Sequence, residues 1–273
     1  MKTAGEALKE TTAAIRDAAQ EEAPQQARLL VAHVLGIEPG VLPLYQGAAI
    51  TNEQTEALQA LVRRRQERVP LQYLLGEWYF MGLPFRVTPG VLIPRQDTEV
   101  LCETALRFAS LWGYRTALDL CCGTGCVGIA LQVLGGLAVT ASDCADECVA
   151  LTRENAERHN ADIQVLQGNW FAPHAGQSFD MIVCNPPYLT GEEMRHLQPE
   201  VAHEPALALY GGEDGLSAYR TIAAQAGAYL RRGGMLLLEV GSEQADDVCA
   251  LFAGEKEVFC DLAGVRRVVC VQT

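Results

Sequence analysis

Apolar residues recur at helical spacing in three segments at the start of the chain. The first covers residues 7–18, and the second covers residues 25–35 and ends at a glycine. The third opens with a capping box that begins at Thr51, and Pro70 stops it. This spacing predicts a small helical bundle over residues 1–70.

The third helical segment carries a run of basic residues, Arg63-Arg64-Arg65 followed by Arg68. Such a run can contact an acidic partner, but like charges on a helix are more commonly its solvated face. We therefore expect these side chains to face solvent.

The pattern changes between Leu71 and Pro94, where aromatic and β-branched residues are interleaved with glycine and proline. This alternation is typical of short strands joined by tight turns. We predict a β-hairpin linker over residues 71–94.

From residue 95 to residue 273, short apolar runs alternate with segments of helical periodicity. Seven runs are strand candidates: residues 117–121, 138–141, 163–166, 181–184, 235–240, 258–260 and 268–271. Alternating strands and helices favour a mostly parallel sheet with helices on both faces. The predicted fold class is α/β, with a seven-stranded sheet domain over residues 95–273.

The composition is that of a globular protein, with 273 residues of which 49% are hydrophobic and 20% charged. The formal net charge is −13, from 21 Lys and Arg against 34 Asp and Glu. Residues 1–85 carry 8 basic and 10 acidic side chains, so most of the excess lies beyond them. A negative field of this size disfavours strong nonspecific binding to nucleic acid.

Ten cysteines are spread along the chain with no CxxC pair and no signal peptide ahead of them. This usage predicts reduced thiols in the cytoplasm, most of them small buried hydrophobic side chains. Zinc sites normally show paired short spacings, so the cysteines between residues 121 and 148 do not predict a metal site. No apolar run approaches the ~20 residues that span a membrane, and we expect no membrane partner.

A glycine-rich turn, Gly123, Gly125 and Gly128, follows a predicted strand and opens a helix. Glycine lets the backbone approach a ligand, and the free amides of a helix start offer donors. Asp143, after the next strand, is placed to accept both hydroxyls of a ribose, or to cap the helix over residues 145–159. The pattern predicts a nucleotide-type cofactor without distinguishing NAD from S-adenosyl-L-methionine (SAM).

Asn185-Pro186-Pro187-Tyr188 follows the strand that ends at Cys184. The Asn185 carboxamide oxygen and the Pro186 carbonyl would accept the two hydrogens of a planar NH₂ group, and Tyr188 would offer an aromatic face. An amide or aromatic amine nitrogen is a poor nucleophile. Two acceptors orient it toward an electrophilic methyl group and stabilise the positive charge that develops. A proline-rich turn alone explains the two prolines but neither flanking residue.

Four stretches together resemble the HemK/PrmC family, the N5-glutamine methyltransferases that modify the Gly-Gly-Gln glutamine of class I peptide-chain release factors. They are Leu92–Glu99, Asn185–Tyr188, residues 204–216 with Glu204-Pro205 and Gly211-Gly212, and residues 237–241. The resemblance covers essentially the whole chain. It implies a Rossmann-like SAM-dependent methyltransferase domain, with SAM as methyl donor, S-adenosyl-L-homocysteine as product and a release factor as protein substrate.

The resemblance also implies roles for individual residues. Asn185, Pro186 and Tyr188 would be catalytic. The cofactor would be bound by Cys121, Cys122, Gly123, Thr124, Gly125, Asp143, Asn169, Trp170 and Asn185. The glutamine would be held by Asn185, Pro186, Pro187 and Tyr188, with Arg95 and Phe80 beside them.

The chain departs from the family pattern at two places. The family's glycine turn usually begins D-L-G-T-G, and here Cys121 and Cys122 replace the first Gly and the Thr. A cysteine is small enough for close approach if its φ stays negative. Asn169 stands where the family often has Asp, and its oxygen can still accept from the adenine amino group. We expect weaker but retained SAM binding.

Several residues have two interpretations. Arg95 would position the substrate backbone or form a structural ion pair, and Glu204 would brace the loop after the catalytic motif. Phe80 would form a wall of the glutamine pocket or pack the hairpin against the bundle. Three of the five histidines, at positions 174, 196 and 203, show no metal or triad spacing, and we expect them at the surface.

Other functions share these motifs. A ribosomal-protein glutamine or the N6 of adenine in nucleic acid poses the same geometric problem, although the acidic charge disfavours direct nucleic-acid binding. An NAD-dependent oxidoreductase would use the glycine turn but leaves Asn185–Tyr188 unexplained, and a non-catalytic binding protein is a further alternative. We expect a monomer whose bundle docks the protein substrate and whose acidic surface complements a basic release factor.

Overall fold

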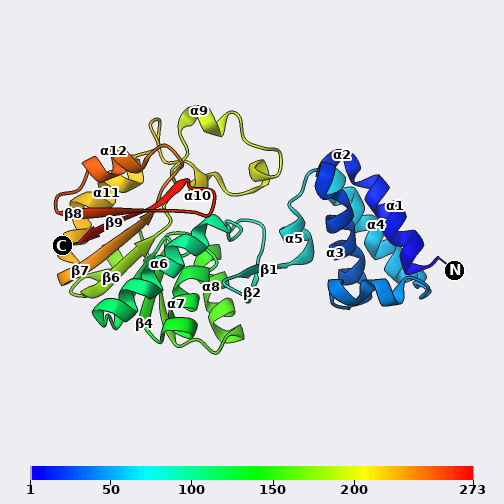
Figure 1. Cartoon of the computed structure of the whole chain (residues 1–273), viewed down its shortest axis with the longest axis horizontal. Coiled ribbons are helices and arrows are strands. Elements are labelled where there is room, and N and C mark those ends of the chain that lie inside the picture. Colours follow the sequence, from blue (N-terminus) through cyan, green and yellow to red (C-terminus); the bar gives the residue numbers. More distant parts are fainter. Residues whose placement is uncertain (1, 273) are drawn as a thin grey trace. The chain divides into compact units, whose positions relative to one another are not determined.

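The computed structural model describes residues 2–272, which divide into two compact units. The first unit runs up to Gly76 and includes Gln198–His203 from much later in the chain. The second unit comprises Glu77–Leu197 and the chain from Glu204 onward. The chain therefore passes between the units three times. Figure 1 labels the elements.

The first unit is helical, as the periodicity predicts. Its elements are α1 (Ala4–Ala14), α2 (Arg16–Ala19), η1 (Gln20–Glu22), α3 (Ala23–Leu35), η2 (Pro39–Tyr45), α4 (Asn52–Gln66), α5 (Leu71–Leu75) and η4 (Val201–His203). The predicted first helix is interrupted at Ile15, a fully buried residue between α1 and α2. Buried alanines such as Ala7 and Ala27 let α1 and α3 approach closely. Thr51 forms the expected capping box at the start of α4.

The basic run on α4 is only partly a solvent-exposed face. Arg63 and Arg64 are exposed, but Arg65 is 3% exposed and lies inside the first unit. Its guanidinium donates to Gln26 Oε1 at 2.8 Å, to the Ala18 carbonyl at 3.0 Å and to Glu200 Oε1 at 2.9 Å. The expectation that the whole run faces solvent was wrong for Arg65 and also for Arg68, which is half-buried. Both bind Glu200, which is distant in the sequence.

The predicted hairpin is shorter than residues 71–94. Residues 71–75 form helix α5, and only β1 (Glu77–Phe80) and β2 (Leu83–Arg86) pair as antiparallel strands. Gly76, at φ +72°, ends α5 in the left-handed conformation that glycine adopts most readily. The hairpin belongs to the second unit and α5 to the first.

The second unit is an α/β domain built on a seven-stranded sheet. Its helical elements are α6 (Asp97–Trp112), α7 (Cys126–Gly135), α8 (Asp146–Arg158), η3 (Ala172–His174), α9 (Gly191–Met194), α10 (Ala206–Leu209), α11 (Ser217–Gln225), η5 (Ala226–Ala228) and α12 (Ala245–Ala250). Its strands are β3 (Thr116–Leu120), β4 (Ala138–Asp143), β5 (Ile163–Gln167), β6 (Phe179–Cys184), β7 (Leu230–Glu239), β8 (Glu255–Cys260) and β9 (Arg266–Gln272). All seven predicted strands are present.

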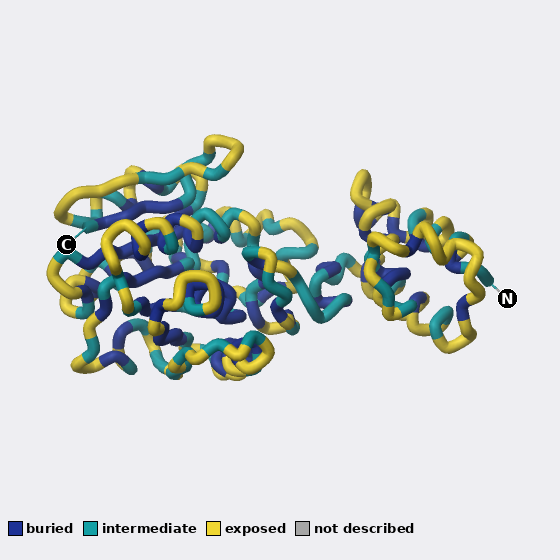
Figure 2. Tube along the Cα trace, turned by 60° about the horizontal axis from the view of Figure 1, so that its bottom comes forward, coloured by how far each residue is buried: buried dark blue, intermediate teal, exposed yellow. Residues whose placement is uncertain are grey.

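The strand order is β5-β4-β3-β6-β7-β9-β8, and β9 is antiparallel to both of its neighbours. Alternate residues of the central strands point to opposite faces. Ala117 and Val183 pack toward α6, α7 and α8, whereas Leu118 and Ile182 pack toward α11 and α12. Two apolar cores result. Figure 2 shows buried residues gathered in the interior of this unit. The predicted mostly parallel sheet with helices on both faces is confirmed.

Within residues 2–272, no single helix is both long and apolar enough to cross a membrane. One pair of helical stretches, Arg16–Leu35 and Pro39–Tyr45, meets the criteria of length and composition together, but it is bent by 78°.

Candidate active site

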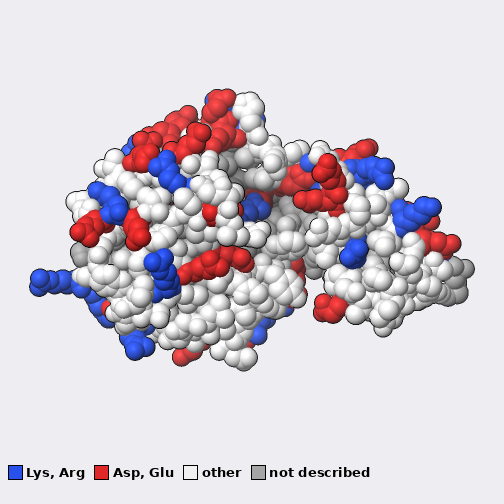
Figure 3. All heavy atoms as spheres, in the orientation of Figure 1, with Lys and Arg blue, Asp and Glu red and all other residues white. Residues whose placement is uncertain are grey.

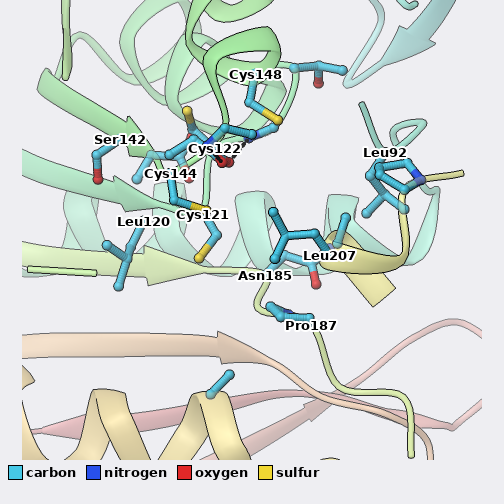
Figure 4. A pocket seen from close by; sticks show the side chains of 18 of the residues that line it. Leu92, Leu120, Cys121, Cys122, Ser142, Cys144, Cys148, Asn185, Pro187 and Leu207 are labelled. Carbon is cyan, nitrogen blue, oxygen red and sulfur yellow. Dashed lines mark hydrogen bonds between the residues drawn. The ribbon is translucent and has the colours of Figure 1, made fainter. Parts of the chain in front are cut away.

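A cavity of about 740 Å³ opens at the carboxyl ends of β3, β4 and β6 in the second unit. Within the sheet, β3 pairs with β4 along one edge and with β6 along its other edge. Parallel α/β sheets bind ligands at such a switch point, and the volume suits a cofactor-sized molecule. In Figure 4 the cysteines gather in one part of the cavity, and Asn185, Pro187 and Leu207 lie together in another.

The turn between β3 and α7 forms one wall of the cavity. Gly125 has φ +78°, and a Cβ there would lie 2.7 Å from Thr152 Cγ2, so this position requires glycine. Gly128 donates its amide to Asp119 Oδ2 at 2.8 Å, which ties the start of α7 to β3. Gly123 and Thr124 line the cavity, whereas Gly125 shapes the turn from outside its lining.

Cys121 adopts φ +62°, so the negative φ that was the condition for close approach of this cysteine is not met. A left-handed backbone ends β3 at Leu120, one residue before the predicted end. Glycine adopts this conformation at no steric cost, but here a cysteine occupies the position. Cys122 follows with its amide donating to the Ser142 carbonyl at 3.0 Å.

Asp143 ends β4 and uses its carboxylate to join two backbone segments. Oδ2 accepts from the Gly123 amide and Oδ1 from the Ala145 amide, both at 3.0 Å. The second bond goes to Ala145, the residue before α8, and no side chain of the described residues caps that helix, so the helix-capping interpretation was wrong. Asp143 also lines the cavity, and each of its oxygens retains a lone pair for a further donor.

Asn169 and Trp170 follow β5 and line the same cavity. Trp170 has φ +49°, an uncommon backbone conformation for a bulky residue, and it packs against the core beside α11 and α12. The structure thus brings both residues to the cavity together with the turn after β3, from strands on opposite sides of β4.

Five cysteines line the cavity: Cys121, Cys122, Cys126, Cys144 and Cys148. Burial raises the pKa of the Cys126 thiol to about 12, and it also raises the pKa of Cys122 and Cys148. The pKa of Cys121 is raised chiefly by its hydrogen bond with Cys184 and then by burial. These groups are therefore neutral thiols at pH 7. Within the described residues, no three His, Cys, Asp or Glu side chains are arranged to hold a metal.

The Asn185-Pro186-Pro187-Tyr188 loop follows β6, which pairs with β3, so the loop begins beside the turn that carries Cys121. Asn185 and Pro187 line the cavity, and Asn185 Nδ2 donates to Thr98 Oγ1 at 3.2 Å. Pro186 is buried and Tyr188 packs against the core beside α11 and α12, so neither side chain is part of the cavity lining. Burial raises the pKa of Tyr188 to about 12, and its carbonyl accepts from Gln244 Nε2 at 2.9 Å.

Arg95 lines the cavity and forms an ion pair with Glu204. The Glu204 side chain is 1% exposed, and its second oxygen accepts from the Ile93 amide at 3.0 Å. Glu204 therefore braces the segment before α6. The expectation from the sequence was that it braces the loop after the catalytic motif. Arg95 serves as an ion-pair partner and still presents its head to the cavity.

Two sequence-based expectations were wrong. Phe80 does not line the cavity; it is 1% exposed and packs edge-on against Phe85 in the core beside α6 and α7. His174 is fully buried, not at the surface, and its Nε2 lies 2.9 Å from Ser142 Oγ. Burial lowers the pKa of His174, so it is neutral at pH 7. The His174 contact joins segments far apart in the sequence.

Sequence reasoning missed several residues of the cavity wall. Leu92, Thr98, Ser142, Leu207 and Thr221 all line it. Thr98 lies in Leu92–Glu99, a stretch that carries the family resemblance, and that resemblance was the only feature of the sequence that could have placed it at the site. Leu207 is 65% exposed and stands on α10, next to the segment after Glu204.

Family models match two parts of the chain. The PrmC N-terminal domain matches residues 6–76, and the methyltransferase small domain matches residues 98–209. Solved structures of methyltransferases share the fold. A methyltransferase from Pyrococcus furiosus superposes with a TM-score of 0.53 at 14% identity, covering 81% of this chain and 98% of that one. The Thermus thermophilus 16S rRNA N2 G1207 methyltransferase, in complex with AdoMet and guanosine, gives 0.54 at 19% identity over 72% of this chain and 49% of its own.

Whole-length relatives are closer in sequence. The release factor glutamine methyltransferase of Geobacter sulfurreducens is 41% identical over 91% of this chain and 89% of its own. That of Cereibacter sphaeroides is 38% identical over 97% of each chain. Both matches are long enough to include parts of the helical unit and of the α/β unit of this chain. The residues that line the cavity, Asn185 among them, lie between positions 90 and 221 of this chain. The chain belongs to the release factor glutamine methyltransferase family.

Proposed function

We propose that this protein transfers a methyl group from SAM to the side-chain amide nitrogen, N5, of the Gly-Gly-Gln glutamine in class I release factors. The observation that carries the proposal is the juxtaposition of the turn after β3 and the Asn185 loop around one cavity. The first wall offers backbone and acidic groups suited to a nucleoside, and the second offers a carboxamide suited to an amide substrate. Full-length similarity to proteins of this name supports the acceptor.

The residues present fit SAM. The Asp143 carboxylate would accept the ribose hydroxyls, Trp170 would cover the adenine, and Asn169 would accept from its amino group. Bound SAM would supply a methyl group from a positively charged sulfur, and breaking that sulfur–methyl bond would leave S-adenosyl-L-homocysteine. Because the thiols around the turn are neutral, the acidic side chains of the lining, Asp143 and Glu147, favour a cationic ligand.

The Asn169 assignment has a direct test. Asn169→Ala removes one acceptor and should weaken SAM binding about five- to tenfold by calorimetry, the effect of one hydrogen bond. Asn52→Ala, on α4 of the first unit, is the matched control and should bind SAM like the wild type. Equal affinities for both variants would contradict the assignment.

The chain's own residues account for the amide chemistry. The Asn185 carboxamide oxygen and the Pro186 carbonyl would accept the two hydrogens of the glutamine NH₂, which turns its nitrogen lone pair toward the methyl group. As the new N–C bond forms, positive charge grows on nitrogen and both acceptors stabilise it. The nitrogen becomes acidic only at that stage and then releases one proton to water, so no strongly basic group is required.

We also infer that the helical unit docks the release factor. Val41, Leu44 and Tyr45 on η2 are exposed apolar side chains of that unit, which suit a protein contact. Leu44→Asp should raise KM for the release factor about tenfold and leave kcat unchanged. Leu262→Asp, at an exposed position on the second unit, is the control. A KM equal to that of the control would exclude Leu44 from the contact.

The proposed function is tested by incubating the protein with SAM and a release factor and mapping added methyl groups by mass spectrometry. Methyl on the Gly-Gly-Gln glutamine is the expected result, and Asn185→Ala should lose it while retaining SAM binding. Methyl found only on a ribosomal protein or a nucleic acid would overturn the acceptor assignment. Tight NAD binding with none of SAM would overturn the methyltransferase assignment.

A further inference from the structure

Glu239 is a buried carboxyl group that the proposed chemistry does not use. It ends β7, is 2% exposed, and in the described part of the chain its Oε2 has no hydrogen-bond partner. A buried carboxyl is costly unless it is paired or serves a purpose. The burial of the Glu239 carboxyl therefore needs a physical reason.

The neighbour that links Glu239 to the site is Thr98, in the first turn of α6. Thr98 is 3% exposed, its hydroxyl hydrogen-bonds with the Glu239 carboxyl, and its Oγ1 accepts from Asn185 Nδ2 at 3.2 Å. A hydroxyl has one hydrogen to donate. Because Oγ1 receives the Asn185 hydrogen, its own hydrogen is available to the carboxylate.

This chain of hydrogen bonds selects one of two orientations of the Asn185 carboxamide. The two orientations have almost the same shape, but only one turns the oxygen away from Thr98. With Nδ2 bound to Thr98, Oδ1 is left to accept from a ligand in the cavity that Asn185 lines. The opposite orientation would present an NH₂ group to the glutamine NH₂, where donor meets donor.

We infer that Thr98 and Glu239 are positioning residues: their hydrogen bonds hold the Asn185 carboxamide with its oxygen toward the acceptor nitrogen. The inference rests on the proposed function. Neither residue touches the reacting atoms; each acts through Asn185.

The arrangement also has a pH dependence. Burial raises the pKa of Glu239 to about 7, against the Thr98 hydrogen bond and the nearby Arg267 and Arg95, which lower it. Ionised Glu239 only accepts, so Thr98 donates to it and accepts from Asn185. Protonated Glu239 can donate to Thr98, which frees the hydroxyl hydrogen for Asn185 Oδ1 and favours the wrong orientation. The correct orientation is therefore strengthened as pH rises through about 7.

Other titratable or charged groups face Glu239 from the elements around it. They are Arg95 before α6, Asp97 at its start, Arg267 on β9, Tyr188 after β6, Tyr219 on α11, Cys184 on β6 and Cys126 on α7. Burial raises the pKa of the two thiols and the two phenols, so these groups stay neutral at pH 7. The charge of Asp97 raises the pKa of Glu239.

The test compares Thr98→Val, Thr98→Ser and Glu239→Gln with the wild type, using SAM and a release factor. Thr98→Val should lower kcat about tenfold or more, with KM for both substrates within about threefold, because orientation is lost and binding is not. Thr98→Ser keeps the hydroxyl and should return kcat to within about threefold of the wild type. Thr104→Val, another buried threonine of α6, is the matched control and should leave kcat unchanged.

The pH profile separates positioning from simple packing. Wild-type kcat should rise with pH through about 7, and Glu239→Gln, which cannot ionise, should lose that rise. Loss of kcat in Thr98→Ser equal to that in Thr98→Val would overturn the inference. An unchanged kcat in Thr98→Val would overturn it as well.

A second measurement keeps the inference testable if the acceptor assignment fails. Hydrogen exchange of the Asn185 side-chain NH₂, identified by comparison with Asn185→Ala in NMR spectra, reports the Thr98 contact without any methyl transfer. Protection in the wild type and in Thr98→Ser, lost in Thr98→Val, is expected. Equal exchange in all three proteins would overturn the positioning role, whereas absence of methylated release factor with normal protection would overturn only the proposed function.

Discussion

At the scale of single residues, the left-handed backbone of Cys121 is the clearest departure from ordinary stereochemistry at the site. Its φ of +62° brings Cβ close to the carbonyl oxygen, which costs roughly 1–2 kcal/mol. A β-branched side chain is still harder to place there. The turn must therefore draw its stability from the surrounding contacts, including the Cys122 amide bound to the Ser142 carbonyl.

We predict that Cys121→Val lowers the unfolding free energy of the second unit by about 2 kcal/mol relative to Cys121→Gly, because only the glycine variant is free of the steric cost. Urea denaturation of the two variants measures this difference. Cys249→Val, on α12 with an ordinary φ, is the control and should cost about 0.5 kcal/mol or less. Equal stability of the two Cys121 variants would show that the turn tolerates side chains at this φ.

A second prediction at this scale concerns the ionisation of Asp119. Burial raises its pKa from 3.8 to about 7; the Gly128 hydrogen bond opposes this rise and the Asp143 charge adds to it. Between those two pH values the folded protein holds a proton that the unfolded chain releases. The contribution of Asp119 to stability therefore falls as pH rises from about 4 to about 7 and is constant above that range.

Asp119→Asn should make the unfolding free energy less dependent on pH over that interval, because asparagine does not ionise and its oxygen still accepts from Gly128. Urea denaturation at about pH 5 and about pH 7.5 measures the slope. Asp162→Asn, at an exposed position, is the control and should keep the wild-type slope. A slope unchanged in Asp119→Asn would mean that Asp119 is ionised throughout.

At the scale of elements, the seven strands of the sheet could be predicted because each is a short apolar run with its own signal. The segment over residues 71–75 could not, because Leu, Gln and Tyr suit a helix and a hairpin alike, and packing against the buried face of the bundle selects the helix. Arg65 shows the same limit. Its sequence neighbours are exposed, and only the return of residues 198–203 to the first unit explains its burial.

The candidate site divides in the same way. The turn after β3, Asp143 and the Asn185 loop could be placed from motif and strand order, because parallel strands bring their carboxyl ends to one edge. The thiol-rich lining, the buried Glu239 and the packing of Phe80 depend on contacts between distant segments. No local pattern predicts such contacts, so they became visible only in the structure.

The returning segment yields a prediction at the scale of elements. Glu200 accepts from Arg65 Nη2 at 2.9 Å and from Arg68 Nη2 at 2.7 Å, and the Arg65 side chain is only 4% exposed. Glu200→Gln leaves the buried guanidinium without its charged partner and should destabilise the first unit by about 2 kcal/mol. Hydrogen exchange should show faster opening of α3 and α4, with the sheet of the second unit unaffected.

Glu192→Gln is the matched control for that experiment. Glu192 pairs with Arg195 on α9, but both side chains are more than half exposed, and exposed pairs contribute about 0–1 kcal/mol. Its exchange pattern should equal that of the wild type. If Glu200→Gln behaved in the same way, the Arg65 charge would be satisfied by Gln26 and the Ala18 carbonyl alone.

At the scale of the whole molecule, the charge is distributed unevenly in sequence, because residues beyond 85 carry 24 acidic against 13 basic side chains. Figure 3 shows acidic side chains gathered over α9 on the visible face of the second unit. Glu192 and Glu193 belong to that helix, and Glu213 lines a groove beside the cavity with Tyr210 and Leu207. An acidic rim around a substrate cavity attracts a basic partner, whereas an acidic surface that serves solubility alone has no effect on catalysis.

Ionic strength distinguishes these two roles. If the rim attracts the release factor, raising salt from about 0.05 M to about 0.3 M should raise KM for that substrate several-fold, because the Debye length shrinks from more than 10 Å to less than 8 Å. The Kd for SAM should change less, since its contacts are short and enclosed. Glu213→Gln should reproduce part of the KM increase at low salt and lose it at high salt. A KM that does not respond to salt in either protein would leave solubility as the role of the acidic surface.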